Sequence, residues 1–141
     1  MKRTIKIDGG SRGNPGPSAF GVYFLESGKT YSQFLGKGTN NEAEYKALIF
    51  ALKKMKALHG KEKVKKMNIE ILSDSQLLVK QMKGEYKVKE DNIKELFLTA
   101  WNLKVDFPNL EINLIPRRDN KEADRLVNEA LDAEKRSQKL F

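Results

Sequence analysis

Cysteine is absent from this 141-residue sequence, and histidine occurs once, at His59. The lack of cysteine excludes disulfides, thiolate metal sites and cysteine nucleophiles. A serine hydrolase with a histidine base would depend on His59, which stands next to Gly60 at the end of a predicted helix and is more typical of a surface or helix-capping residue. The sequence therefore does not favour catalysis by a nucleophile and a histidine base.

Long apolar runs are also missing. No stretch approaches the roughly 20 residues that a membrane-spanning helix needs, and residues 1–4 lead into a predicted strand rather than into a signal peptide. A composition of 39% apolar and 33% charged residues is typical of a folded chain of one compact domain. We expect a single domain over residues 1–141, acting as a cytoplasmic monomer with no membrane partner.

Basic residues outnumber acidic ones, which gives a formal charge of +8 and a pI of about 9.6. This balance favours a polyanionic partner, nucleic acid first and an anionic membrane surface second. Solvated helix faces or a heat-adapted surface would explain the lysines as well, so charge alone leaves the partner open. The lysines gather in two groups, Lys53, Lys54, Lys56, Lys61, Lys63, Lys65 and Lys66, and then Lys80, Lys83, Lys87 and Lys89.

Alternating apolar residues predict strands, and apolar residues at intervals of three and four predict helices. Thr39 and Glu42 form a predicted capping box at the start of the first helix, and Gly60 ends it. Trp101 is expected in the core, because it falls on the apolar stripe of the third helix. The predicted strands cover residues 4–8, 19–25, 31–35, 68–72 and 111–115, and the predicted helices cover residues 41–58, 76–82, 93–101 and 123–131.

This order of elements predicts an α/β fold with a mixed sheet. Three consecutive strands form an antiparallel meander, and the later strands alternate with helices, so they need helical crossovers and should lie parallel. Ligands of such sheets bind beyond the carboxyl ends of the parallel strands. Candidate functional residues are therefore expected at that edge.

Four acids are expected at or near this edge. Asp8 is predicted to end the first strand, Asp74 follows the fourth, and Asp124 lies in the first turn of the last helix. Glu44 precedes Leu48 by four residues and so lies along the inward-facing stripe of the first helix. An inward-facing glutamate needs a partner.

Each acid also has an ordinary structural explanation. Asp8 could be a turn residue, Asp74 a helix cap, and Glu44 and Asp124 acids that complement helix dipoles. Several carboxylates at one sheet edge would repel one another, however, unless cations join them, and hard divalent ions prefer oxygen ligands. Magnesium is the natural choice, and acids within a basic surface indicate phosphodiester chemistry.

Four segments of the chain resemble type 1 ribonuclease H, in that family's order and over nearly the whole chain. The resemblance implies a ribonuclease-H-like fold, a five-stranded mixed sheet with helices on both faces. It also implies an endonuclease that cuts the RNA strand of an RNA/DNA hybrid, leaves 5'-phosphate and 3'-hydroxyl ends, and uses two Mg²⁺ ions per site, with Mn²⁺ as an alternative. The segments are Asp8 to Gly16 (DGGSRGNPG), Thr39 to Tyr45 (TNNEAEY), Ser73 to Gln76 (SDSQ) and Asn120 to Asp124 (NKEAD).

The resemblance also implies roles for individual residues. The metal-binding and catalytic carboxylates would be Asp8, Glu44, Asp74 and Asp124. Backbone and minor-groove contacts, where a 2'-hydroxyl distinguishes RNA from DNA, would come from a larger set. That set is Gly9, Gly10, Ser11, Asn14, Asn40, Asn41 and Gln76, with Asn120 near the scissile phosphate.

The chain departs from the family pattern in the loop before the last helix. Many bacterial members carry a histidine there, whereas this loop has Arg117 and Arg118, and archaeal-like members also lack the histidine. Either arginine is expected to stabilise the phosphate or the leaving group. Residues 83–91 are too short for the extra basic helix of some members, so Lys87 and Lys89 are expected to contribute substrate affinity.

Two functions remain open. One is a metal-dependent hybrid nuclease, with double-stranded RNA as an undecided further substrate. The other is a ribonuclease-H-like domain that binds nucleic acid without cutting it. A scaffold would be free to lose a carboxylate, and all four are present, which favours the enzyme. The last residues, Leu140 and Phe141, either pack back on the domain or fray.

Overall fold

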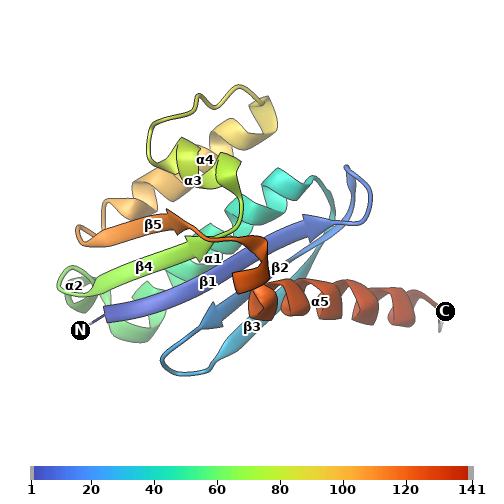
Figure 1. Cartoon of the computed structure of the whole chain (residues 1–141), viewed down its shortest axis with the longest axis horizontal. Helices are drawn as coiled ribbons and strands as arrows, with labels where there is room; N and C mark the ends of the chain where they lie inside the picture. The colour runs from blue at the N-terminus through green and yellow to red at the C-terminus, as the bar shows by residue number, and fades with distance from the viewer. Residues whose placement is uncertain (1, 140–141) are drawn as a thin grey trace.

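The computed structural model describes residues 2–139, and its centre is a five-stranded mixed sheet in the order β3-β2-β1-β4-β5 (Figure 1). The pairs β1 with β2 and β2 with β3 are antiparallel, and the pairs β1 with β4 and β4 with β5 are parallel. The predicted α/β fold is therefore confirmed. The strands are β1 (Lys2–Ser11), β2 (Gly16–Phe24), β3 (Thr30–Gly38), β4 (Asn68–Ser73) and β5 (Leu110–Leu114).

The helices agree with the predicted ones and add two short elements. A four-residue helix follows the first long helix, and a 3-10 turn fills the arginine loop. The C-terminal residues Leu140 and Phe141 lie outside the described residues. The helices are α1 (Asn40–His59), α2 (Lys61–Val64), α3 (Gln76–Met82), α4 (Asp91–Lys104) and α5 (Lys121–Lys139), and the 3-10 turn is η1 (Arg117–Asp119).

The first long helix begins at the predicted capping box. The Thr39 hydroxyl accepts a hydrogen bond from the Glu42 N–H (3.1 Å), and the Glu42 carboxylate accepts one from the Thr39 N–H (2.9 Å). These bonds satisfy two backbone donors at the start of α1. The α1 helix ends where Gly60 adopts a positive φ of 83°.

Helices cover both faces of the sheet, as Figure 1 shows for α1 and α5. The larger core lies on the face of α1, α3 and α4, where Ile5, Ile7 and Leu48 are fully buried. The other face carries a smaller cluster in which Val127 and Leu131 of α5 pack beside strand residues. No helix among residues 2–139 is long and apolar enough to cross a membrane.

Trp101 was expected in the core, and that prediction is wrong. Its side chain is 40% exposed on the flank of α4, whereas Ile93 and Ala100 take the buried positions of the helix. The Trp101 ring stacks on Phe97 with 5.6 Å between centroids, and the Lys104 ammonium lies 4.4 Å from the ring centroid. These local contacts shelter the indole without burying it.

The first strand is longer than predicted, so Asp8 does not end it. The β1 strand continues through Gly9 and Gly10 to Ser11, because these residues keep their pairing with β2. Pairing with β4 does stop here, at the Ile7 and Ser73 pair. Asp8 therefore lies just beyond the last β1 residue that pairs with the parallel strand β4. The β1 strand itself continues past Asp8, paired only with the antiparallel strand β2.

Candidate active site

Two glycines allow helices to approach the strands beside Asp8. A Cβ atom on Gly9 would lie 2.3 Å from the Ala43 carbonyl carbon and 2.4 Å from the Glu44 nitrogen, so β1 runs directly against the backbone of α1. Gly21 is the β2 partner of Asp8, and a Cβ there would lie 2.4 Å from the Ala123 carbonyl oxygen of α5. These two close approaches place Glu44 of α1 on one face of the sheet and the first turn of α5 on the other face, both next to Asp8.

Asp8, Glu44 and Asp74 form a compact acidic cluster. One carboxylate oxygen from each lies within 4.8 Å of the other two. Asp8 and Glu44 are buried, at 7% and 8% exposure, and Asp74 is partly buried. The three residues come from β1, from α1 and from the residue after β4, so the fold joins positions far apart in the sequence.

Burial and mutual repulsion disfavour the charged forms of these acids. Burial, followed by the charges of Asp74 and Asp124, raises the pKa of Asp8 to about 8. Burial and the charges of Asp8 and Asp74 raise the pKa of Glu44 well above its ordinary value. Burial also raises the pKa of Asp74, although hydrogen bonding from Asn120 and the charge of Arg117 oppose the shift. A cation within the cluster would remove this penalty.

Asp74 is not a helix cap, because the cap of α3 is Ser75. The Ser75 hydroxyl accepts a hydrogen bond from the Leu78 N–H at 3.2 Å. Asp74 therefore has no part in starting the helix, and its carboxylate is free to turn toward the cluster.

Asn120 lies inside the protein rather than on a nucleic-acid-binding surface. It is fully buried, and its amide nitrogen donates to the Ile7 carbonyl oxygen at 2.8 Å and to an Asp74 carboxylate oxygen at 3.4 Å. The Asn120 Oδ1 atom is buried without a hydrogen-bond partner among the described residues. The residue predicted beside the scissile phosphate thus bridges β1 and Asp74.

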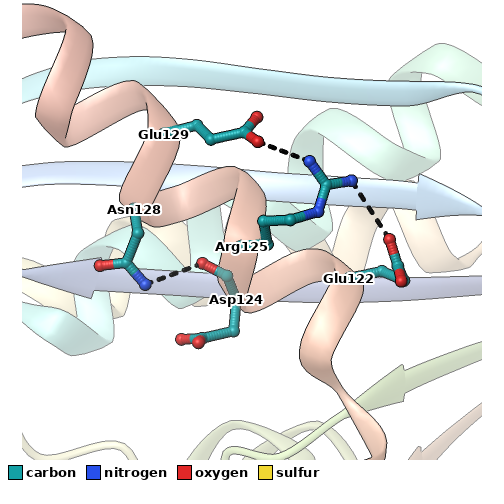
Figure 2. Close-up of polar contacts among 5 residues, drawn as sticks. All are labelled: Glu122, Asp124, Arg125, Asn128 and Glu129. Atoms are coloured by element: carbon teal, nitrogen blue, oxygen red, sulfur yellow. Dashed lines mark hydrogen bonds and ion pairs between the residues drawn. The ribbon is translucent and has the colours of Figure 1, made fainter.

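Asp124 lines the same cleft but lies outside the three-residue cluster. Figure 2 shows its carboxylate pointing away from Arg125, which pairs with Glu122 and Glu129 instead. The Asn128 amide donates to the Asp124 backbone oxygen at 3.1 Å and not to the carboxylate (Figure 2). The Asp124 carboxylate is left without an ion-pair partner in the part of the chain that the structure describes.

The cleft around the acids has a volume of about 370 Å³. The predicted contact residues Gly9, Gly10, Ser11 and Asn40 line it, and so does Arg117. Four predicted contacts lie outside the lining, as does the second arginine. These residues are Asn14, Asn41, Gln76, Asn120 and Arg118.

Hydrogen bonds tie the predicted contact residues to one another. The Ser11 N–H donates to the Asn40 side-chain oxygen at 2.8 Å, and the Asn40 N–H donates to the Asn14 side-chain oxygen at 3.0 Å. Gln76 is exposed, and its amide lies 3.4 Å from the Tyr86 hydroxyl. The loop after β1 is thereby fixed to the start of α1.

The cleft is also lined by four residues that no sequence motif marked as candidate site residues. Asn128 lies four residues after Asp124, on the same face of the helix. This spacing from a candidate acid was the sequence signal that could have identified Asn128 as a cleft residue. Arg12 lies within the DGGSRGNPG segment and is anchored by Asp132 at 2.7 Å. The four residues are Arg12, Val127, Asn128 and Leu131.

The cluster suits an oxygen-ligated divalent cation. Its donor atoms are carboxylate oxygens, which Mg²⁺ and similar hard ions prefer. One of these atoms, Glu44 Oε2, is buried without a hydrogen-bond partner in residues 2–139. A buried acceptor without a donor is costly, and a bound cation would satisfy it.

Comparison with known proteins gives relatives along nearly the whole chain. The sequence pattern of the family described as reverse transcriptase-like matches residues 6–130. A bifunctional protein of Mycobacterium tuberculosis is 40% identical over 138 residues, which cover 94% of this chain and 36% of that protein. Ribonuclease HI of Halobacterium salinarum is 39% identical, covering 89% of this chain and 62% of that protein. The chain thus spans about a third of the mycobacterial relative's length and less than two thirds of the halobacterial one's.

A solved structure matches nearly the full length of this chain and of its own. LC11-RNase H1, isolated from compost, has been solved in complex with an RNA/DNA hybrid. That structure is 44% identical to this chain with a TM-score of 0.86, and the match covers 94% of this chain and 98% of the other. The chain therefore belongs to the reverse transcriptase-like family and, within it, to the type 1 ribonucleases H.

Proposed function

We propose that this chain is an endoribonuclease that hydrolyses the RNA strand of RNA/DNA hybrids and leaves 5'-phosphate and 3'-hydroxyl ends. The observation that carries the proposal is the buried cluster of Asp8, Glu44 and Asp74, in a basic chain of the ribonuclease H family. The hybrid bound to LC11-RNase H1 supports the substrate. Residues 1–141 would form one such domain.

Asp8, Glu44 and Asp74 would hold a divalent metal, and Asp124 at the same cleft would complete a site for a second one. We propose Mg²⁺ as the metal, with Mn²⁺ as an alternative. The bound ions would supply electrostatic stabilisation of the attacking and leaving oxygens of an in-line displacement. The protein's own contribution is to keep the carboxylates together at a strand edge against which α1 and α5 pack closely.

Arg117 is proposed to stabilise negative charge on the phosphate. It is exposed, it lines the cleft, and its positive charge lowers the pKa of both Glu44 and Asp74 against the larger upward effect of burial. Arg118 does not line the cleft. Of the two arginines in the loop, Arg117 is therefore the candidate that faces the reacting group.

Backbone and side chains at the end of β1 and the start of α1 are proposed to read the hybrid. Gly10, Ser11 and Asn40 line the cleft beside the acids, and the hydrogen bond between Ser11 and Asn40 fixes their relative positions. Recognition of the RNA strand depends on contacts to its 2'-hydroxyls from the minor groove. A positioned amide and hydroxyl can make such contacts.

The proposal is tested by incubating the purified chain with end-labelled RNA/DNA hybrid, double-stranded RNA, single-stranded RNA or duplex DNA. Each substrate is given Mg²⁺, Mn²⁺ or EDTA. We expect cleavage of the hybrid's RNA strand with either metal and none in EDTA. Hybrid binding without cleavage under any metal would instead support a domain that binds nucleic acid without cutting it. Cleavage in the samples with double-stranded RNA would show that double-stranded RNA is a further substrate.

A further inference from the structure

A second cavity lies at the end of the sheet opposite the acidic cleft. Its volume is about 420 Å³, against about 370 Å³ for the cleft. The lining comes from the start of β1, the hairpin between β2 and β3, and the end of α1, which Figure 1 shows at the end of the sheet that holds the N-terminus. Thr4 in this lining and Asp8 in the cleft are four residues apart, roughly 13 Å along a strand, so the two cavities are separate.

One wall of this cavity is apolar. Phe24 and Met55 present nearly buried side chains, and Leu58 is 41% exposed although it continues the apolar stripe of α1. An exposed leucine beside a cavity offers contact area that no other part of the described chain covers. This wall suits an apolar or aromatic group.

The other wall is basic. Arg3, Lys29 and His59 line the cavity. Burial is the main cause of the lowered pKa of His59, and the positive charges of Lys63, Arg3 and Lys29 add to it. No ion pair involves Arg3, Lys29 or Lys63 within residues 2–139. Arg3 and Lys29 do not lie at the C-terminus of α1, so the dipole of that helix does not account for their positive charges.

The cavity is preformed. A Glu26 carboxylate oxygen accepts a hydrogen bond from the Thr4 N–H at 2.7 Å, and the Leu25 N–H donates to the Thr4 carbonyl oxygen at 3.0 Å. These bonds fasten the β2–β3 hairpin to β1. Glu26 is the one acid in the lining among the described residues, and part of its charge is engaged by this backbone contact.

We propose that this cavity binds a phosphate monoester of nucleotide size, with the phosphate beside Arg3 and Lys29 and the apolar part against Phe24 and Leu58. Cationic side chains recognise phosphate, and the volume falls within the roughly 300 to 1,000 Å³ of small-molecule sites. A nucleoside 5'-monophosphate has both parts, either as a free nucleotide or as the 5' end of a strand. The proposal does not depend on the nuclease activity.

The test is a titration of the ¹⁵N-labelled full chain, in EDTA, with adenosine 5'-monophosphate, inorganic phosphate or adenosine. We expect saturable amide shifts at Thr4, Lys29 and His59 with the nucleotide, and a Kd at least about tenfold lower than for phosphate or adenosine. The absence of saturable shifts would overturn the proposal. So would shifts confined to Ser11 and Asn40 in the cleft, or a nucleotide that binds no more tightly than phosphate.

A charge-matched pair of variants locates the site. Arg3→Gln combined with Lys29→Gln should weaken nucleotide binding at least about tenfold. Lys135→Gln combined with Lys139→Gln, on the far part of α5, should leave it unchanged; equal weakening in both pairs would contradict the site. Lys29, Lys135 and Lys139 are exposed and Arg3 is partly exposed, so the variants should keep the wild-type spectrum elsewhere.

A competition experiment separates the two sources of the ligand. A single-stranded oligonucleotide with a 5'-phosphate, and the same strand with a 5'-hydroxyl, are each added to the nucleotide complex. Displacement by the phosphorylated strand alone identifies a strand end as the occupant, and displacement by neither identifies the free nucleotide; both results uphold the site. Equal displacement by the two strands would contradict recognition of a phosphate monoester.

Discussion

At the scale of single residues, the acidic cleft is shaped by burial of carboxylates that would otherwise be ordinary surface acids. Asp8 and Glu44 are almost fully buried, and Asp74 is held by Asn120 on one side. The sequence pointed to all three acids but gave no sign that Asn120 would be buried. Its place depends on η1 folding back over β1, and no local pattern in the sequence reports such a contact.

The raised pKa of Asp8 predicts how the metal-free protein responds to pH. The Asp8 carboxyl titrates near pH 3.9 when unfolded and near pH 8 when folded, so the folded state holds the extra proton between these values. The free energy of unfolding should therefore fall as the pH rises from about 4 to about 8, by up to about 1.4 kcal/mol per pH unit for each proton. Thermal unfolding in EDTA measures this slope.

Mg²⁺ should raise the melting temperature more at pH 8 than at pH 5, because it competes with protons for the same oxygens. Asp8→Asn should flatten the pH dependence in EDTA. A slope equal to the wild-type slope in that variant would show that the titrating group lies elsewhere.

Asn120→Ala should destabilise the protein by about 1 to 3 kcal/mol, because it leaves the buried Ile7 carbonyl oxygen without its donor. It should also lower kcat more than it changes KM, since Asp74 loses its partner but the surface contacts with substrate remain. Asn102→Ala, at an exposed position of α4, is the matched control. If the two variants had the same stability, Asn120 would have no bridging role.

At the scale of elements, the site depends on the close approach of α1 and α5 to the strands at Gly9 and Gly21. The helix spacing, the capping box and the strand alternation were readable because they are local patterns. The extension of β1 through Gly9 and Gly10 was not, since glycine is depleted in strands and only pairing with β2 keeps these residues extended. Trp101 fell on a helical stripe, but α4 buries only part of that stripe.

Gly9→Ala should be severely destabilising, by about 3 kcal/mol or more, because the added methyl group would meet the backbone of α1 at 2.3 Å. Gly10→Ala is the matched control, since its nearest neighbour would lie at an ordinary 3.5 Å. Chemical denaturation of the two variants gives the comparison. Equal midpoints would mean that the β1–α1 contact can relax without cost.

At the scale of the whole molecule, the net charge of +8 is distributed over lysine groups with different positions. One group surrounds the end of α1, at the pole away from the acids. Lys87 and Lys89 instead lie in the segment between α3 and α4, after the helix that starts beside Asp74. This arrangement favours the second group as the one that meets the hybrid.

Affinity for the hybrid should fall as salt rises, because bound lysines release counterions from the phosphates. Lys87→Gln combined with Lys89→Gln should reduce the slope of log K against log salt by about 2, whereas Lys53→Gln combined with Lys66→Gln should leave it unchanged. Filter binding in EDTA, which prevents cleavage, measures both slopes. A smaller slope in the Lys53 and Lys66 pair than in the Lys87 and Lys89 pair would instead place the hybrid near the end of α1.

If the buried acids hold the metal that supports hydrolysis of the RNA strand, loss of one acid should abolish cleavage. The initial rate of hybrid cleavage in Mg²⁺ should therefore be measured for the wild-type chain, for Asp74→Asn and for the exposed control Asp91→Asn. We predict a loss of at least about 100-fold in Asp74→Asn and no change in Asp91→Asn. Wild-type rates in a folded Asp74→Asn protein would show that Asp74 does not hold a metal needed for hydrolysis.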